Sequence, residues 1–258
     1  MSSILLNREG PVLRVTLNRP DVRNAFDEEV VASLMSAATR AADDAGLRAV
    51  VLAGAGKTFC AGADIGWMAK AIAYSRRENL SDAEDLARML ERLDTLPVPV
   101  VGRIQGSALG GGVGLAAVCD IVIAAEDAVF ALSEVKLGIL PAVVAPYVLR
   151  KIGVSAAREL FLTGARFTAS RAKEIGLVHE IVPAVELDAA VARRIEEILT
   201  AGPSGIAKAK SLIRAIAGAQ PSDVIGVTTN AIAAQRVSDE GQEGLRAFLE
   251  KRKPSWTA

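Results

Sequence analysis

The stretch VPVVGRIQGSALGGGVGLAAVCDIVIA, residues 98–124, decides the fold class of this chain. It opens with a short apolar run, 98–104, that predicts a buried strand, and a second strand is predicted at about 120–124. Between them the glycine-rich segment 106–114 continues into an apolar, Ala-rich stretch, 113–118, that is typical of a helix. Strand, glycine-rich turn, helix and strand in this order predict an α/β protein.

The preceding residues repeat this alternation. Residues 12–18 alternate apolar and polar side chains, which predicts a half-exposed strand. Apolar residues then recur at helical spacing over 27–45, with Asp27 as the expected N-cap. A short apolar run, 48–53, predicts a buried strand, and a second glycine-rich loop, 54–63, follows it directly.

Helices dominate the remainder of the chain. Ser81 and Glu84 have the spacing of a capping box, which predicts the start of a helix that ends near residue 94. No low-complexity linker divides the sequence, so we expect a core over 1–200 and a helical region over 201–258.

Composition narrows the classes of partner. Apolar residues make up 51% of the 258 residues and aromatic residues 4%, and 30 Lys and Arg balance 30 Asp and Glu. A chain without net charge has no field that attracts nucleic acid or an anionic membrane surface, so we expect neither partner. The mean hydropathy of +0.31 predicts more apolar surface than suits a monomer, and a homo-oligomer would cover it.

Cysteine usage and the N-terminus predict the compartment. The cysteines, Cys60 and Cys119, suit free thiols in a reducing cytosol. Asn7, Arg8 and Glu9 interrupt the apolar run that a signal peptide would need. No stretch contains the roughly 18 uninterrupted apolar residues of a spanning helix, so a cytoplasmic protein is expected.

The two glycine-rich loops are the expected chemical centre. Glycines let a backbone approach a ligand closely, and a helix start offers unpaired N–H groups and a partial positive charge. Two such amides on one carbonyl oxygen would form an oxyanion hole. Phosphate-binding motifs do not fit, because a P-loop needs Gly where Val51 stands and a dinucleotide fingerprint needs Gly where Leu115 stands.

Five segments, in order along nearly the whole chain, resemble the enoyl-CoA hydratase/isomerase (crotonase) family. They are NRP at 18–20 with Asn24-Ala25, FCAGADI at 59–65, GSALGGG at 106–112 with CDI at 119–121, SEVKLGI at 133–139, and GLRAFLEKR at 244–252. The resemblance implies a ClpP-like spiral of ββα units, a C-terminal helical trimerisation region, and a homotrimer or a dimer of trimers.

The resemblance also implies a site. The oxyanion hole would be the amides of Ala63 and Gly111, and Glu134 would be the acid and base. The substrate is expected to be an acyl-CoA thioester, with no metal and no cofactor besides the CoA that is part of the substrate. The residues implied along the CoA and acyl path are Arg23, Ala25, Ala61, Asp64, Ile65, Gly110, Gly114, Leu140, Phe248 and Lys251.

One position departs from the well-known hydratases, which carry a second glutamate where this chain has Gly114. Hydration needs a proton at the α carbon and a water at the β carbon, whereas an isomerase needs one carboxylate. The segments 112–115, 133–135 and 140–148 resemble a bacterial branch associated with 3-methylglutaconyl-CoA and carboxygeranoyl-CoA. Our hypothesis is that Gly114 clears space, and removes a repelling charge, beside a carboxylate of such a substrate.

Three functions therefore stay open. The leading one is a lyase that hydrates an α,β-unsaturated acyl-CoA and uses Glu134 as its acid and base. The second is a Δ3–Δ2 isomerase with Glu134 as its single base, and the third is a non-catalytic homologue that binds CoA or RNA. His179, Cys60, Cys119 and Asp120 are expected to be structural, and segment 66–80 is expected to line the acyl pocket.

Overall fold

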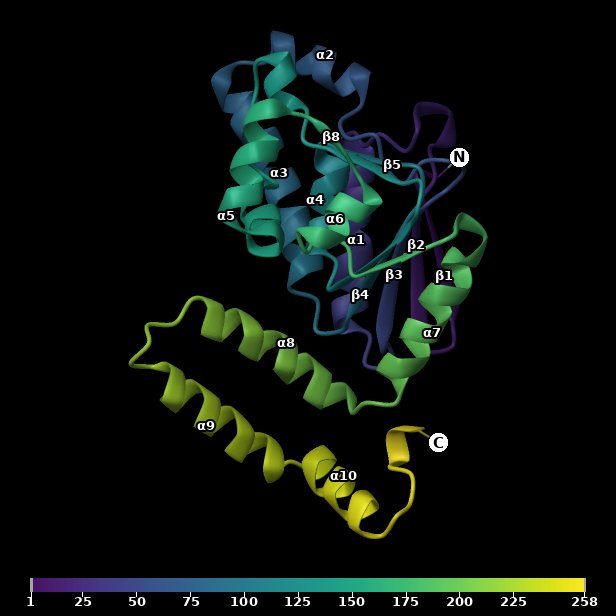
Figure 1. Ribbon diagram of the computed structural model, residues 1–258, viewed down its shortest axis with the longest axis vertical. Helices are drawn as coiled ribbons and strands as arrows, with labels where there is room; N and C mark the ends of the chain where they lie inside the picture. Colours follow the sequence, from purple (N-terminus) through teal and green to yellow (C-terminus); the bar gives the residue numbers. More distant parts are fainter. Residues whose placement is uncertain (1, 258) are drawn as a thin grey trace.

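A twisted, mostly parallel sheet forms the centre of the computed structural model, which describes residues 2–257 (Figure 1). Its strands run in the order β1-β2-β3-β4-β6-β9. β1 is antiparallel to β2, and each later neighbour is parallel. The strands are β1 Ile4–Glu9, β2 Val12–Leu17, β3 Ala49–Gly54, β4 Val100–Ile104, β6 Ile121–Ala125 and β9 Glu180–Val182.

Both faces of this sheet are covered. Successive side chains of a strand point to opposite faces, so β3 sends Val50 and Leu52 into the main core and Ala49 and Val51 into a second one. Helix α7 (Leu187–Leu199) covers the second core. The predicted α/β class is confirmed, and the continuous apolar character of β3 follows from its burial on both faces.

A smaller sheet carries the parts of the chain that reach the site. It consists of β5 (Ser107–Leu109), β7 (Val129–Ala131) and β8 (Arg166–Thr168). β5 is parallel to β7, which is antiparallel to β8. These three-residue strands were not predicted, because so short a run has no measurable alternation. β1 was not predicted either, because its sequence ILLNRE does not alternate apolar and polar side chains.

Helices surround the sheets. They are α1 Glu28–Asp43, α2 Ile65–Ala73, α3 Arg76–Asp94, α4 Gly111–Val118, α5 Ala145–Thr163, α6 Ala169–Glu174, α8 Pro203–Ala217, α9 Val224–Arg236 and α10 Asp239–Leu249, besides α7. The expected N-cap of α1 is confirmed, since Val30 N donates to Asp27 Oδ1 at 3.1 Å. α5 contains a break at Gly153, whose φ is 71°.

The predicted capping box was wrong by one and a half turns. Ser75 and Glu78 form the reciprocal pair: Glu78 N donates to Ser75 Oγ at 3.3 Å, and Ser75 N to Glu78 Oε2 at 2.7 Å. Ser81 and Glu84 lie inside α3. Two Ser-x-x-Glu patterns, 75–78 and 81–84, lie close together in this stretch, and sequence alone does not rank them.

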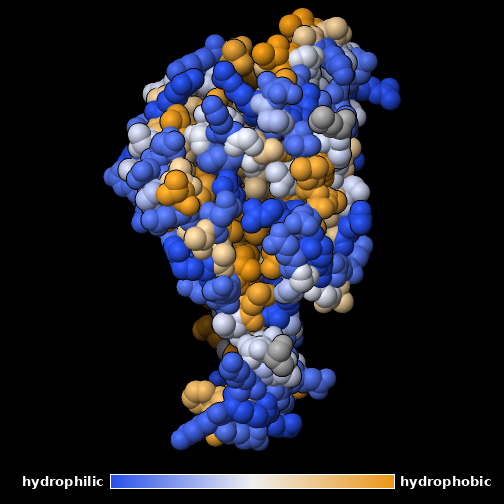
Figure 2. Space-filling model, turned by 90° about the vertical axis from the view of Figure 1, so that its right-hand side faces the viewer, coloured by the Kyte–Doolittle hydropathy of each residue, from blue (hydrophilic) through white to orange (hydrophobic). Residues whose placement is uncertain are grey.

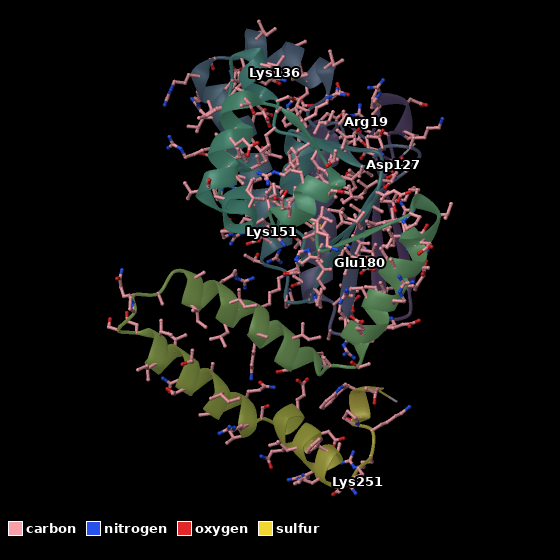
Figure 3. All side chains as sticks on the ribbon, in the orientation of Figure 1. Arg19, Asp127, Lys136, Lys151, Glu180 and Lys251 are labelled. Carbon is pink, nitrogen blue, oxygen red and sulfur yellow. The ribbon has the colours of Figure 1, made fainter. Side chains whose placement is uncertain are left out.

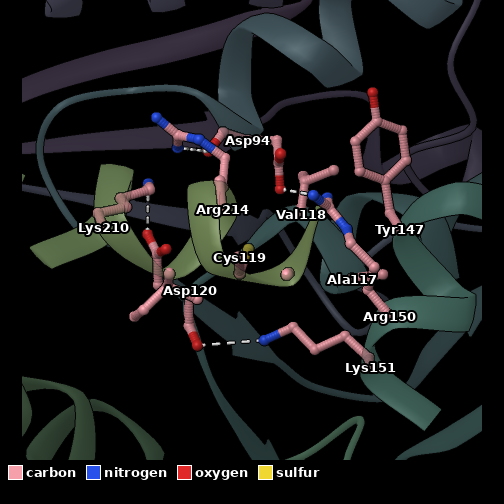
Figure 4. A pocket seen from close by; sticks show the side chains of 12 residues that line it. Asp94, Ala117, Val118, Cys119, Asp120, Tyr147, Arg150, Lys151, Lys210 and Arg214 are labelled. Atoms are coloured by element: carbon pink, nitrogen blue, oxygen red, sulfur yellow. Dashed lines mark hydrogen bonds and ion pairs between the residues drawn. The ribbon is translucent and has the colours of Figure 1, made fainter. Parts of the chain in front are cut away.

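The C-terminal helices extend away from the body of the protein (Figure 1). Figure 2 shows that the molecule is narrow where these helices join the body. Helix α8 is tied to the body around a cavity of about 290 Å³ (Figure 4). There Lys210 Nζ lies 2.6 Å from Asp120 Oδ2, and Arg214 donates to Asp94 O at 3.3 Å. Within residues 2–257, no helix has the length and apolarity needed to cross a membrane.

Candidate active site

The two glycine-rich loops lie side by side because the strands before them are neighbours. β3 and β4 are adjacent and parallel, so both loops leave the same edge of the sheet. The loops then pair with each other: Cys60 N donates to Ser107 O at 3.0 Å, and Leu109 N donates to Cys60 O at 3.0 Å. Backbone hydrogen bonds thus fix the loop 54–63 against the residues that lead into α4.

The contact between the loops is closest at Gly62. Its φ is +90°, and a methyl group added there would lie 2.8 Å from Leu109 O and 3.7 Å from Gly111 N. Only glycine allows this backbone conformation together with so close an approach. Gly62, the residue before Ala63, therefore lies next to the amide of Gly111.

Two amides at this junction have no acceptor. Across residues 2–257, neither Ala63 N nor Gly111 N donates a hydrogen bond. Gly111 is the first residue of α4, where the N–H groups have no partner within the helix and carry its partial positive charge. The Phe26 ring packs behind it, since a methyl group on Gly111 would lie 2.1 Å from Phe26 Cζ.

Glu134 approaches the same place from the small sheet. It begins the short helix η2 (Glu134–Leu137), shortly after β7. Its carboxylate packs on Gly110, the N-cap of α4: a methyl group there would lie 3.1 Å from Oε1 and 3.9 Å from Oε2. Oε2 is buried and has no hydrogen-bond partner among the described residues. Burial raises the pKa of Glu134 above its ordinary 4.5, although a hydrogen bond from its own backbone opposes the shift.

This raised pKa predicts how Glu134 affects stability. A folded-state pKa above the unfolded one means that the carboxyl favours the folded state fully below pH 4.5, and that this contribution is lost as pH rises through the raised value. We therefore expect Glu134→Gln to raise the midpoint temperature of unfolding at pH 7. Thermal scans should show the gain shrinking as pH falls toward 4.5, and a gain independent of pH would contradict this cause.

Arg19 holds the end of the glycine-rich loop 54–63 in place, and no role was predicted for it from the sequence. Its guanidinium lies 3.1 Å from Asp27 Oδ2 and 3.1 Å from Asp64 Oδ2, and it donates to Ala25 O at 2.7 Å. Asp64 in turn caps α2 by accepting from Gly66 N at 2.7 Å. Arg19 thus joins α1, α2 and the loop between β2 and α1. The sequence offers a signal for the contact with Asp27, because this N-cap lies only eight positions after Arg19, but none for the contact with Asp64.

Replacing Arg19 should loosen this junction. We expect Arg19→Leu to cost about 1–3 kcal/mol of folding free energy, because two partly buried carboxylates and a carbonyl lose their donor. Arg19→Lys keeps the charge but not the planar fork, so it should recover only part of the loss. Urea unfolding measures both variants, and wild-type stability in Arg19→Leu would contradict the role.

Other residues implied by the resemblance lie around the loops. Ala61 N donates to Arg23 O at 3.0 Å, and Ala25 is buried beside them. Ile65, at the start of α2, and Leu140, after η2, are exposed by 81% and 68%. These two side chains are free to meet a ligand on the outside of the junction.

The C-terminal residues are not part of this cluster within one chain. Phe248 is 80% exposed at the end of α10, and Lys251 follows it. Figure 3 shows Lys251 at the far end of the helical region, remote from Arg19 in the body. Any contact of theirs with a ligand at the loops would require a neighbouring subunit.

One expectation needs correction. Gly114 does not clear space, because a methyl group there would lie 2.2 Å from Val144 Cγ1 and 2.9 Å from Val144 Cβ. Trp67 is buried and lines a cavity of about 370 Å³ between α1, α2 and α3, which includes neither Glu134 nor Gly111. That segment 66–80 lines the acyl pocket stays a prediction. Asp82, within α3, accepts a hydrogen bond from Trp67 Nε1 at 2.9 Å.

The remaining polar candidates have structural partners. His179 Nδ1 accepts from Val122 N at 3.0 Å, and burial lowers the pKa of this imidazole. Asp120 accepts from Val100 N at 2.7 Å and pairs with Lys210. Cys60 is fully buried, and burial raises its pKa to about 12, so it is a neutral apolar side chain at neutral pH.

Paired free amides beside a buried carboxylate define a centre suited to moving a proton next to a carbonyl group. The family model described as enoyl-CoA hydratase/isomerase matches residues 7–258. The chain belongs to this family, also called the crotonase family, and is an enzyme with the crotonase fold.

Relatives match along essentially the whole chain. The structure of an enoyl-CoA hydratase from Shewanella pealeana is 41% identical, with a TM-score of 0.95 over 98% of this chain and 96% of that one. AtuE of Pseudomonas aeruginosa is 39% identical, with a TM-score of 0.96 over 99% of this chain and 100% of that one. The 2,3-dehydroadipyl-CoA hydratase of Escherichia coli is 31% identical over 264 residues, 99% of each chain.

Proposed function

We propose that this enzyme is an enoyl-CoA hydratase. The thioester oxygen would accept hydrogen bonds from Ala63 N and Gly111 N, which stabilise it as the α carbon gains carbanion character. Water would add to the β carbon, and Glu134 would exchange the proton at the α carbon. The observation that supports this most is the pair of amides without acceptors beside an unpartnered carboxylate oxygen.

A single carboxylate also supports a second candidate, a Δ3–Δ2 enoyl-CoA isomerase. Shifting a double bond needs one group to carry a proton between two carbons, and Glu134 could do this alone. Incubation with a 2-enoyl-CoA and separately with a 3-enoyl-CoA distinguishes the two functions. Loss of the enone absorbance of the first supports the hydratase, whereas conversion of the 3-enoyl-CoA alone would overturn it.

The acyl group of the substrate is a further proposal. The name of the Escherichia coli relative describes a chain derived from a dicarboxylic acid, which supports a carboxylated acyl group here as well. The space once expected at Gly114 no longer contributes to this proposal, because Val144 fills it. Comparing kcat/KM for linear, β-branched and carboxylated 2-enoyl-CoA esters tests it, and the proposal fails if the carboxylated esters are the poorest substrates.

We also propose a homotrimer or a dimer of trimers, in which Phe248 and Lys251 reach the CoA of a neighbouring subunit. Large apolar side chains on the C-terminal helices are exposed in the single chain, which supports an assembly that covers them. They are Ile225, Ile232, Val237, Leu245, Phe248 and Leu249. Sedimentation equilibrium tests the assembly, and a monomer at micromolar concentration would contradict it.

A further inference from the structure

The environment of Gly114 leaves no room for a side chain. A Cβ there would lie 2.2 Å from Val144 Cγ1, 2.9 Å from Val144 Cβ and 3.8 Å from Val144 Cα. Rotating the valine side chain could move Cγ1 but not Cβ, so any side chain at position 114 requires the backbone at Val144 to shift. Gly114 and Val144 therefore fit each other as a small and a large residue across two elements.

Val144 is held where it is. It is 3% exposed and is the N-cap residue of α5, where its carbonyl accepts from Val148 N at 3.1 Å and from Tyr147 N at 3.2 Å. These bonds begin the helix, so moving Val144 would disturb the first turn of α5. A larger residue at 114 thus meets a fixed neighbour rather than a flexible one.

Position 114 is also next to the catalytic carboxylate. Gly110 is the N-cap of α4, and Gly114 N donates to Gly110 O at 3.4 Å, so Gly114 lies one turn along the helix from Gly110. The Glu134 carboxylate packs on Gly110. One turn of α4 therefore separates the contact of Glu134 with Gly110 from the contact of Val144 with Gly114.

We propose that Gly114 and Val144 are a matched pair that restricts this site to one carboxylate. Val144 occupies the room through which a side chain at 114 would leave α4 beside Glu134. This inference rests on the proposed function, in which Glu134 then handles both protons. It takes a proton from the water whose oxygen bonds to the β carbon, and it returns a proton to the α carbon of the resulting enolate.

The pairing predicts that a second carboxylate can be introduced only by changing both positions. Gly114→Glu alone should lower the midpoint of thermal unfolding strongly, because the new side chain has no room. Val144→Gly alone should lower it moderately, because it leaves a cavity. The double variant, Gly114→Glu with Val144→Gly, should be more stable than Gly114→Glu, so the two changes are not additive.

Hydration kinetics test the functional half with crotonyl-CoA as the probe. The matched control is Gly114→Gln with Val144→Gly, which has the same shape at 114 but cannot transfer a proton as a carboxylate does. We expect kcat of the double variant with Glu to exceed that of the control by about tenfold or more, a conservative share of what an added acid or base supplies. KM should differ little between these two variants.

Each outcome decides the proposal. Wild-type stability of Gly114→Glu, or failure of the Val144→Gly change to recover stability, would overturn the pairing. Equal kcat in the Glu and Gln double variants would show that position 114 does not face the reacting atoms. If the wild type hydrates none of the 2-enoyl-CoA esters but isomerises 3-enoyl-CoA, the proposed hydratase function fails, while the unfolding data still test the pairing.

Discussion

Glu134→Gln should lower kcat for hydration about 10²–10⁴-fold, the usual contribution of a general acid or base. The amide has nearly the shape of the carboxyl group but cannot exchange a proton as the carboxyl does. Within residues 2–257, Glu134 Oε2 has no hydrogen-bond partner that the substitution would remove. Steady-state assays with a 2-enoyl-CoA measure kcat and KM, and we expect KM to change little.

The matched control is Glu134→Asp, which keeps a carboxylate but withdraws it by one methylene. Its kcat should lie between those of the wild type and of Glu134→Gln. A wild-type kcat in Glu134→Gln would contradict the assignment of Glu134. If the wild-type protein bound CoA esters but turned over none of them, a non-catalytic CoA-binding protein would be favoured.

Ala63→Pro should lower kcat about 10²–10³-fold, because proline has no N–H and an oxyanion hole that loses one donor loses stabilisation of this order. Ala63 N makes no hydrogen bond within residues 2–257, so the substitution removes no bond from the fold. Hydrogen bonds of the adjacent residues keep the loop in place: Phe26 N donates to Gly62 O at 2.9 Å, and Asp64 N donates to Phe26 O at 3.0 Å.

Ala63→Gly is the control for this variant, because it keeps the N–H and removes only the methyl group. It should retain most of the wild-type kcat. Thermal unfolding of both variants separates loss of the donor from loss of structure. A folded Ala63→Pro enzyme with undiminished kcat would mean that this amide does not contact the thioester oxygen.

Much of the fold was predictable because its signals are local. The burial of β3 and β4, the Asp27 N-cap and the change from strand to helix at Gly111 each depend on residues adjacent in sequence. The motif order then implied which loops lie together, and the structure brings Gly62 next to the amide of Gly111.

Other features were not predictable because they depend on partners distant in sequence. Val144 meets Gly114 across two helices, so the glycine alone suggested open space where the fold places an isopropyl group. Arg19 reaches Asp64 across 45 positions, and nothing near either residue announces the pair. The cavity beside Trp67 likewise depends on how α1 packs against α3.

The carbonyl stretching frequency of a bound substrate tests the central claim most directly. A 2-enoyl-CoA labelled with ¹³C at the thioester carbonyl can be bound to Glu134→Gln, which should not turn it over, and observed by infrared difference spectroscopy. If two amides donate to the thioester oxygen, the carbonyl band of the bound substrate should lie at a clearly lower frequency than that of the free thioester. In the double variant, Glu134→Gln with Ala63→Pro, the frequency should return toward the free value. An unshifted band in Glu134→Gln would contradict an oxyanion hole made by Ala63 and Gly111.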